Sequence, residues 1–355
     1  MDKHCQQQLQ KFGMLQADIT HVCIAPGLFP LLQYLLVMDD DVVFNHTYYF
    51  VCEIIPEEMR EQLPCSCFDY YGKSLTQKIR RRCDKIKLRL CKYLEYPFLR
   101  NAELFAYDIP YLSLCIGERP YSLLSDAPNW LNLHMQPTSE VYRLQQQKAS
   151  SLVGRIQRWF YGDLFVHHFG NNMQCRAVYL TEENSSPIME GKQVFVQSLD
   201  TLYNKSSEKK RQFIKKLFNI QEEDIALLNQ YSNLFFSQPL LKDCGLTEDE
   251  YVKILQKIFK NYPEGSIIIK THPRDTFDYK KFFPKVVVFS KSINSQLLYL
   301  MGVRPQRIIT VSSTAIEGFP EAIECDYYGN SIHPKIEAYL GNNFRSSRKV
   351  NHITD

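Results

Sequence analysis

The residues best suited to chemistry in this sequence lie in the segment 267–275, which reads IIIKTHPRD. Its three consecutive isoleucines predict a buried strand, and the carboxyl end of a strand is where an open α/β sheet binds its ligands. Lys270, His272 and Arg274 follow at that end. Cations on both sides of an imidazole suit a departing phosphate, because they hold its charge while the histidine donates a proton. The alternative is a histidine-proline turn whose ring only packs or caps.

A second segment, 307–319, reads RIITVSSTAIEGF and predicts a strand that runs into a helix. Ser312, Ser313 and Thr314 lie at the turn between them. Hydroxyl groups beside the free N–H groups of a helix start can bind an anion, although the same residues also serve as ordinary helix caps. Taken together, the two segments predict two sides of one phosphate-binding pocket.

The elements that must position these residues follow from the alternation of apolar strands and helical text. In the first half, strands are expected within 21–27, 47–55, 103–109, 121–129, 176–184 and 193–199, with a helix after the first of them. In the second half, strands are expected within 233–240, 266–273, 286–292, 307–319 and 324–329, with helices at 247–262 and 295–302. Strands that alternate with helices predict parallel sheets with right-handed crossovers.

The length of 355 residues also favours two domains. We therefore predict an α/β protein of two Rossmann-like domains that face each other across a cleft. The predicted boundaries are 1–205 for the first domain, 206–330 for the second and 331–355 for a C-terminal tail, with a Lys-rich polar stretch leading into the second domain.

Composition excludes several classes of protein. Lys and Arg number 42 against 39 Asp and Glu, and this balance gives no support for a nucleic-acid partner. The eleven cysteines are odd in number and lack metal-ligand or redox spacing, so we expect reduced thiols. No apolar run has the length of a signal peptide or a bilayer span. The expected location is cytoplasmic, and the dinucleotide, serine-hydrolase and zincin motifs are absent from the sequence.

The order and spacing of SQPL (237–240), KTHPRD (270–275) and VSSTA (311–315) resemble the donor domain of the bacterial family 52 glycosyltransferases. The best-known members of that family are lipooligosaccharide sialyltransferases, and its motifs are shared with capsular polysialyltransferases. The segment 121–129 resembles the strand and acidic loop of the same enzymes. The resemblance implies a GT-B fold and transfer of sialic acid from CMP-sialic acid to a terminal sugar of a bacterial lipooligosaccharide or capsule, with inversion.

The resemblance also implies roles for individual residues. His272 is expected to be the general acid for the departing CMP, and either Asp243 or Asp126 the general base. Two candidates remain because Ser125-Asp126-Ala127 stands where relatives have two acids and a glycine. The expected ligands of the donor phosphate are Lys270, Arg274, Ser312, Ser313 and Thr314.

The nucleoside of the donor is expected at Asn294, Ser295 and Gln296, where the family commonly has an acidic residue. That departure keeps other donors open, namely a UDP-hexose, CMP-Kdo or CDP-glycerol. A protein that binds nucleotide sugars with weakened catalysis is a further alternative. We expect no cofactor and no metal ion, because CMP leaves with one phosphate and the motif supplies His and Arg.

Partners other than the donor follow from the basic segment 77–96, which interleaves cations with apolar residues. Such a segment can lie on the anionic inner face of a membrane, which suits a lipid-linked glycan acceptor, or it can be a solvated helix face. Members of the family that this sequence resembles form dimers, so a homodimer is an alternative to a monomer.

Overall fold

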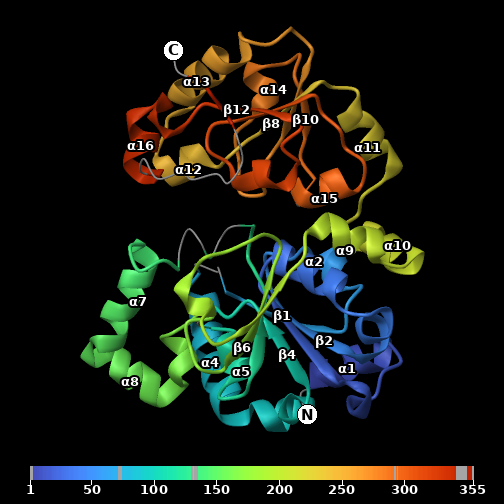
Figure 1. Ribbon diagram of the computed structural model, residues 1–355, viewed down its shortest axis with the longest axis vertical. Helices are drawn as coiled ribbons and strands as arrows, with labels where there is room; N and C mark the ends of the chain where they lie inside the picture. The colour runs from blue at the N-terminus through green and yellow to red at the C-terminus, as the bar shows by residue number, and fades with distance from the viewer. Residues whose placement is uncertain are drawn as a thin grey trace. The chain divides into compact units, whose positions relative to one another are not determined.

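The computed structural model describes residues 3–70, 74–109, 111–128, 131, 135–291, 293, 295–340 and 350–353. The chain divides into two compact units, Met1–Asn219 and Ile220–Asp355. Each unit contains one parallel sheet with helices packed on it (Figure 1).

The sheet of unit 1 has the strand order β3-β2-β1-β4-β5-β6-β7. All pairings between the described strands of this sheet are parallel, as the alternation of strands and helices predicted. The order from β3 to β5 is that of a doubly wound fold, in which ligands bind outside the carboxyl ends of the strands where the order reverses. The strands are β1 (His21–Ala25), β2 (Thr47–Cys52), β3 (Cys65–Phe68), β4 (Glu103–Ala106), β5 (Tyr121–Leu123), β6 (Cys175–Leu180) and β7 (Gln193–Val196).

Strand β3 was not predicted, because its sequence CSCF has no β-branched residue. The helices of unit 1 among the described residues are α1 (Lys3–Lys11), α2 (Leu28–Val37), α3 (Glu57–Arg60), α4 (Leu75–Glu95), α5 (Ser113–Ile116), α7 (Glu140–Ser150), α8 (Leu152–Tyr161), α9 (Leu199–Lys205) and α10 (Glu208–Leu217).

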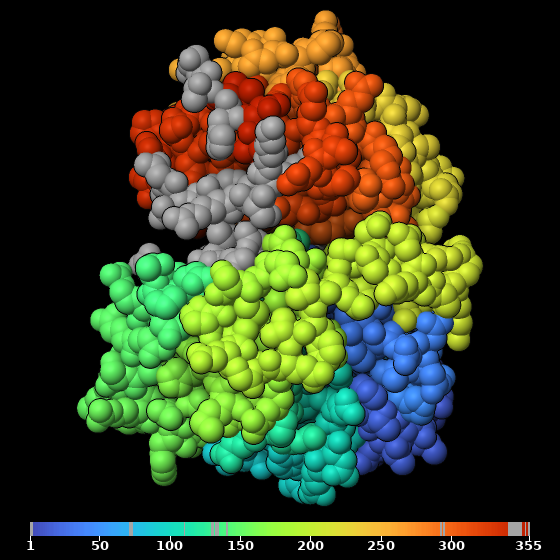
Figure 2. All heavy atoms as spheres, in the orientation of Figure 1, coloured from blue at the N-terminus to red at the C-terminus, as the bar shows by residue number. Residues whose placement is uncertain are grey.

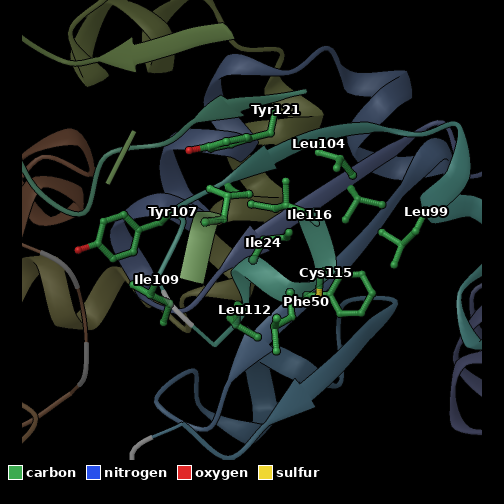
Figure 3. Packing of buried hydrophobic residues seen from close by; sticks show 14 of the residues in the cluster. Ile24, Phe50, Leu99, Leu104, Tyr107, Ile109, Leu112, Cys115, Ile116 and Tyr121 are labelled. Atoms are coloured by element: carbon green, nitrogen blue, oxygen red, sulfur yellow. The ribbon is translucent and has the colours of Figure 1, made fainter. Parts of the chain in front are cut away.

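The core of unit 1 forms where side chains of neighbouring strands meet helix α5. Ile24, Phe50 and Leu104 come from three adjacent strands and pack in one buried cluster with Cys115 (Figure 3). Tyr107 follows β4, and its hydroxyl points away from this cluster (Figure 3). The apolar packing therefore fixes the end of β4 while leaving a polar group at the carboxyl edge of the sheet.

Helices α9 and α10 belong to unit 1, although their sequence looked like a linker. Lys210 is 4% exposed and pairs with Asp40 at 3.1 Å, while its ammonium group also donates to the Met38 carbonyl. Beside it, the Lys209 ammonium lies 4.1 Å from the centre of the Phe44 ring. These contacts hold α10 near the end of α2 (Figure 1). They explain why the units divide after Asn219, where the sequence predicted a boundary after residue 205.

Unit 2 repeats the doubly wound order, with its sheet arranged β10-β9-β8-β11-β12-β13. The pairings between the described strands of this sheet are also all parallel. Strand β8 lies between β9 and β11, so the segments that follow these three strands are neighbours at one edge of the sheet. The strands are β8 (Asn233–Phe236), β9 (Ile267–Lys270), β10 (Val287–Phe289), β11 (Arg307–Thr310), β12 (Glu324–Tyr327) and β13 (Asn351–His352).

The helices of unit 2 include the capping box that the sequence predicted, in which Thr247 and Glu250 each accept the backbone N–H of the other. Residues 331–355, expected to be a tail, contribute helix α16 and pair strand β13 with β12. The helices are α11 (Glu222–Asn229), α12 (Leu240–Cys244), α13 (Glu248–Phe259), α14 (Tyr279–Phe282), α15 (Ser295–Leu300) and α16 (Pro334–Leu340).

Candidate active site

The candidate site of unit 2 is organised by Ser237 and Gln238, the first two residues after β8. The Ser237 hydroxyl accepts the backbone N–H of His272 at 3.0 Å and donates to the Asp275 carboxylate at 2.5 Å. On the other side, the side-chain oxygen Oε1 of Gln238 accepts hydrogen bonds from the backbone N–H of Ser312 at 3.0 Å and from its hydroxyl at 2.9 Å. One dipeptide therefore ties the segments after β9 and β11 to the central strand between them.

His272 is held as a neutral ring in the free protein. Its Nδ1 accepts the backbone N–H of Arg274 at 3.0 Å, which requires that nitrogen to be unprotonated. Burial, followed by the charges of Arg274 and Lys270, lowers the pKa of His272 to about 4. An anion bound beside the ring would act in the opposite direction, because a neighbouring negative charge favours the imidazolium.

The two cations on either side of His272 have different surroundings. Lys270 is buried at the end of β9, where its ammonium group donates to the Thr271 carbonyl, and burial lowers its pKa to about 8. Arg274 is half exposed and makes two bonds to the carboxylate of Asp243, at 3.1 and 2.9 Å. A buried ammonium group beside an exposed guanidinium can receive a phosphate, since no carboxylate of the described residues pairs with Lys270.

The pairing of Asp243 with Arg274 changes its expected role. Both carboxylate oxygens accept hydrogen bonds from the guanidinium, so the ion pair occupies this carboxylate. The residue is thus better placed to orient Arg274 than to collect a proton from a sugar hydroxyl.

The segment after β11 differs in two respects from the predicted helix start. It forms a short 3-10 turn, Thr314–Gly318, in which the Ser313 hydroxyl accepts the Ala315 N–H. Ser312 bonds to Gln238 through both its N–H and its hydroxyl, so it acts as an anchor. The hydroxyls of Ser313 and Thr314 are the groups that lie toward solvent and can meet an anion.

The predicted nucleoside residues lie against this turn. A Cβ at Gly318 would stand 2.7 Å from the backbone nitrogen of Gln296 and 2.9 Å from the carbonyl carbon of Ser295. Only glycine permits this approach, which seats the start of α15 beside the 3-10 turn. Gln296 is buried there. Asn294, the third residue of the predicted set, lies outside the described residues.

Asp126 lies in unit 1, after β5, in a segment that is fixed by its neighbour Ser125. The Ser125 N–H donates to the Gln33 side chain at 2.7 Å, and the Ser125 hydroxyl donates to the Tyr179 carbonyl at 2.9 Å. Burial raises the pKa of Asp126 to about 6, while a hydrogen bond from Tyr107 opposes that rise. A carboxyl group with this pKa can accept a proton near neutral pH.

The structure thus gathers most of the predicted phosphate site. Lys270, His272 and Arg274 follow β9 and the serine segment follows β11, and these two strands flank β8 instead of being adjacent to each other. The sequence assigned no role to Gln238 or to Asp275, which accepts from Ser237 and from the Tyr279 hydroxyl at 2.7 Å. The only available signal for Gln238 was its place inside the SQPL motif.

The chain was compared with families and proteins of known sequence. Residues 141–336 match the model of glycosyltransferase family 52. A protein of Haemophilus influenzae whose function is uncharacterised is 34% identical over 276 residues, which cover 78% of this chain and 81% of that protein.

Solved structures with a similar fold include sialyltransferases from Photobacterium. A 2,6-sialyltransferase from Photobacterium sp. JT-ISH-224, crystallised with CMP and lactose, has a TM-score of 0.57 at 10% identity, covering 93% of this chain and 78% of that one. The GT-B domain of a Photobacterium damselae sialyltransferase has a TM-score of 0.51 at 12% identity, covering 90% and 97%. These similarities establish the GT-B fold, which the sequence had predicted.

Replacing Gln238 by methionine should loosen the candidate site. The variant leaves two donors of Ser312 without their acceptor, so we expect the free energy of unfolding to fall by about 1 to 3 kcal/mol. Chemical denaturation measures this change, with the exposed Gln230→Met as the matched control. Equal stability of the two variants would show that the bonds of Gln238 do not hold the segment after β11.

Proposed function

Because the chain belongs to glycosyltransferase family 52, we propose that it transfers sialic acid from CMP-sialic acid to a terminal sugar of a bacterial surface glycan. The observation that carries the proposal is the set of Lys270, His272 and Arg274 after β9, tied through Ser237 and Gln238 to the hydroxyl segment after β11. These groups match the needs of a departing nucleotide monophosphate. A sialyltransferase of the same fold holds CMP in its crystal structure, which supports this choice of donor.

In this mechanism, residues of unit 2 stabilise and protonate the leaving group. As the bond between the anomeric carbon and the phosphate oxygen breaks, negative charge grows on the phosphate. Lys270 and Arg274 stabilise that charge, and the hydroxyls of Ser313 and Thr314 donate hydrogen bonds to it. The same anion raises the pKa of His272, so the ring can take up a second proton from water, giving up its bond from the Arg274 N–H, and then protonate the departing CMP. The mechanism assigns this work to side chains and requires no metal ion.

The acceptor hydroxyl must lose a proton as it attacks the anomeric carbon from the opposite side, which inverts the configuration. We assign this step to Asp126, because its pKa of about 6 leaves it ionised yet basic at neutral pH. Asp243 is the alternative base, and its two bonds to Arg274 argue for a supporting role. A lipid-linked glycan of a lipooligosaccharide or capsule is the acceptor class that we propose.

Nucleotide binding tests the donor. We expect CMP to raise the melting temperature of the protein, since a ligand that binds only the native state stabilises it by mass action. His272→Ala should slow transfer from CMP-sialic acid to lactose by about 10²- to 10⁴-fold, the usual contribution of a general acid. Thermal-shift titration and product chromatography measure the two effects.

UDP, CDP and GDP serve as controls in the same titration. Stabilisation by UDP alone would replace the donor with a UDP-hexose. CMP is also released from CDP-glycerol and from CMP-Kdo, so when CMP binds, the donor consumed in the transfer assay identifies the group that is transferred. If CMP binds but only CMP-Kdo is consumed, the donor sugar is Kdo. No response to any nucleotide would remove the basis of the proposal.

The pH dependence of transfer tests the base. A protonated carboxyl cannot accept the hydroxyl proton, so kcat/KM should fall as the pH drops below about 6, where Asp126 becomes protonated. Asp126→Asn should lower kcat by about 10²- to 10⁴-fold and remove this acidic limb. Asp243→Asn should retain the limb. If Asp243→Asn removed the acidic limb and Asp126→Asn retained it, the base would be Asp243.

A further inference from the structure

Large apolar side chains are exposed on two helices of unit 1, and no part of the proposed transfer uses them. Among the described residues, α8 exposes five of them, with Trp159 81% and Leu152 74% accessible. Helix α4 exposes five more, with Leu90 68% accessible. The five on α8 are Leu152, Val153, Ile156, Trp159 and Phe160, and the five on α4 are Leu75, Ile79, Ile86, Leu90 and Leu94.

The residues of α8 form one face of the helix. At 100° per residue, the five apolar side chains fall within an arc of about 120°, and Arg155 flanks that arc. The side turned to the protein is marked by Gly154, where a Cβ would meet the Lys148 carbonyl oxygen at 1.7 Å. Helix α8 therefore packs on α7 through its small residue, while its apolar side chains are exposed. The segment that contains α8 lies at the surface of unit 1 (Figure 2).

Helix α4 lies beside the end of α8 and also exposes large apolar side chains. The Arg89 side chain donates to the Phe160 carbonyl at 2.5 Å, which joins the two helices. The exposed apolar residues of α4 recur every four or seven positions, and among the residues of this helix only Leu88 and Lys92 are buried. The basic segment 77–96 is therefore an amphipathic helix whose apolar stripe lies outward, rather than a helix with a purely polar exposed face.

The net charge of these two helices differs from that of the rest of the chain. Together α4 and α8 contain ten Lys or Arg and two Asp or Glu, a net charge of +8, whereas the whole chain has +3. The remaining residues are consequently net −5. A second copy bound through the same face would set like charges against each other, while an anionic surface would be attracted.

We propose that the apolar face of α8, with the stripe and cations of α4 beside it, docks on an anionic lipid bilayer. An interfacial helix of this kind buries its apolar residues at the level of the lipid head groups, while Lys and Arg pair with anionic lipids. Trp159 suits that depth, because tryptophan favours the membrane interface. The contact is peripheral, since no helix among the described residues combines the length and hydrophobicity needed to cross a bilayer. The proposal does not rest on the donor assigned above.

Vesicle sedimentation with the full chain tests the proposal. We expect the protein to sediment with vesicles of phosphatidylcholine and phosphatidylglycerol at 7:3, and at least tenfold less with phosphatidylcholine alone. Binding should weaken as NaCl rises from 0.1 to 0.5 M, because salt screens the lipid charge. Ile156→Ser with Trp159→Ser should reduce the partition coefficient at least tenfold, and Met173→Ser, an equally exposed apolar site elsewhere, should leave it unchanged.

Fluorescence of the unaltered face supplies a second measurement. The chain has two tryptophans, so Trp130→Phe leaves Trp159 as the reporter. Its emission should shift to shorter wavelength on anionic vesicles and be quenched by brominated lipid. Equal binding of the α8 and Met173 variants, or no spectral shift, would overturn the proposal. A concentration-dependent dimer that the α8 substitutions abolish, without vesicle binding, would replace the membrane with a second copy.

Discussion

Two side chains at the end of β8 hold the segments that follow both of its neighbouring strands. The Ser237 hydroxyl accepts the backbone N–H of His272 and donates to Asp275, while the Gln238 side chain accepts the backbone N–H of Ser312. A parallel sheet brings strand ends to one edge but does not by itself fix the loops that leave them. These bonds supply that constraint, and the positions of the imidazole and of the hydroxyl segment depend on it.

The two cations of the candidate site differ in what balances their charge, because Arg274 pairs with Asp243 whereas Lys270 donates to a carbonyl. Lys270 is buried and donates to the Thr271 carbonyl, and its charge together with that of Arg274 adds to burial in holding His272 neutral. Such an arrangement is costly in free energy without an anion, since burial disfavours a cation that has no opposite charge nearby. A bound phosphate would compensate the charge of Lys270 and at the same time prepare His272 to donate a proton. Binding and acid catalysis would thus follow from one electrostatic event.

Much of this architecture could be predicted from the sequence, because runs such as IIIK and RIIT have the β-branched content of buried strands and chemistry-bearing residues follow them. The partners of those residues could not. Gln238 meets Ser312 across 74 positions, and Asp243 meets Arg274 across 31, distances that no local pattern encodes. The linker-like composition of α10 hid a buried Lys210, so the boundary between units lay later than expected. The 3-10 turn after β11 replaced a predicted helix because Gly318 and its contact with α15 end it early.

The titration of His272 tests the central claim most directly. Histidine-labelled protein has nine imidazoles, and the His272→Gln variant identifies the signal of interest in an NMR spectrum. The account predicts a midpoint near pH 4 in the free protein and a clearly higher midpoint when CMP is bound, because the phosphate offsets Lys270 and Arg274. A midpoint near the ordinary histidine value in the free protein, or one that CMP binding leaves unchanged, would contradict it.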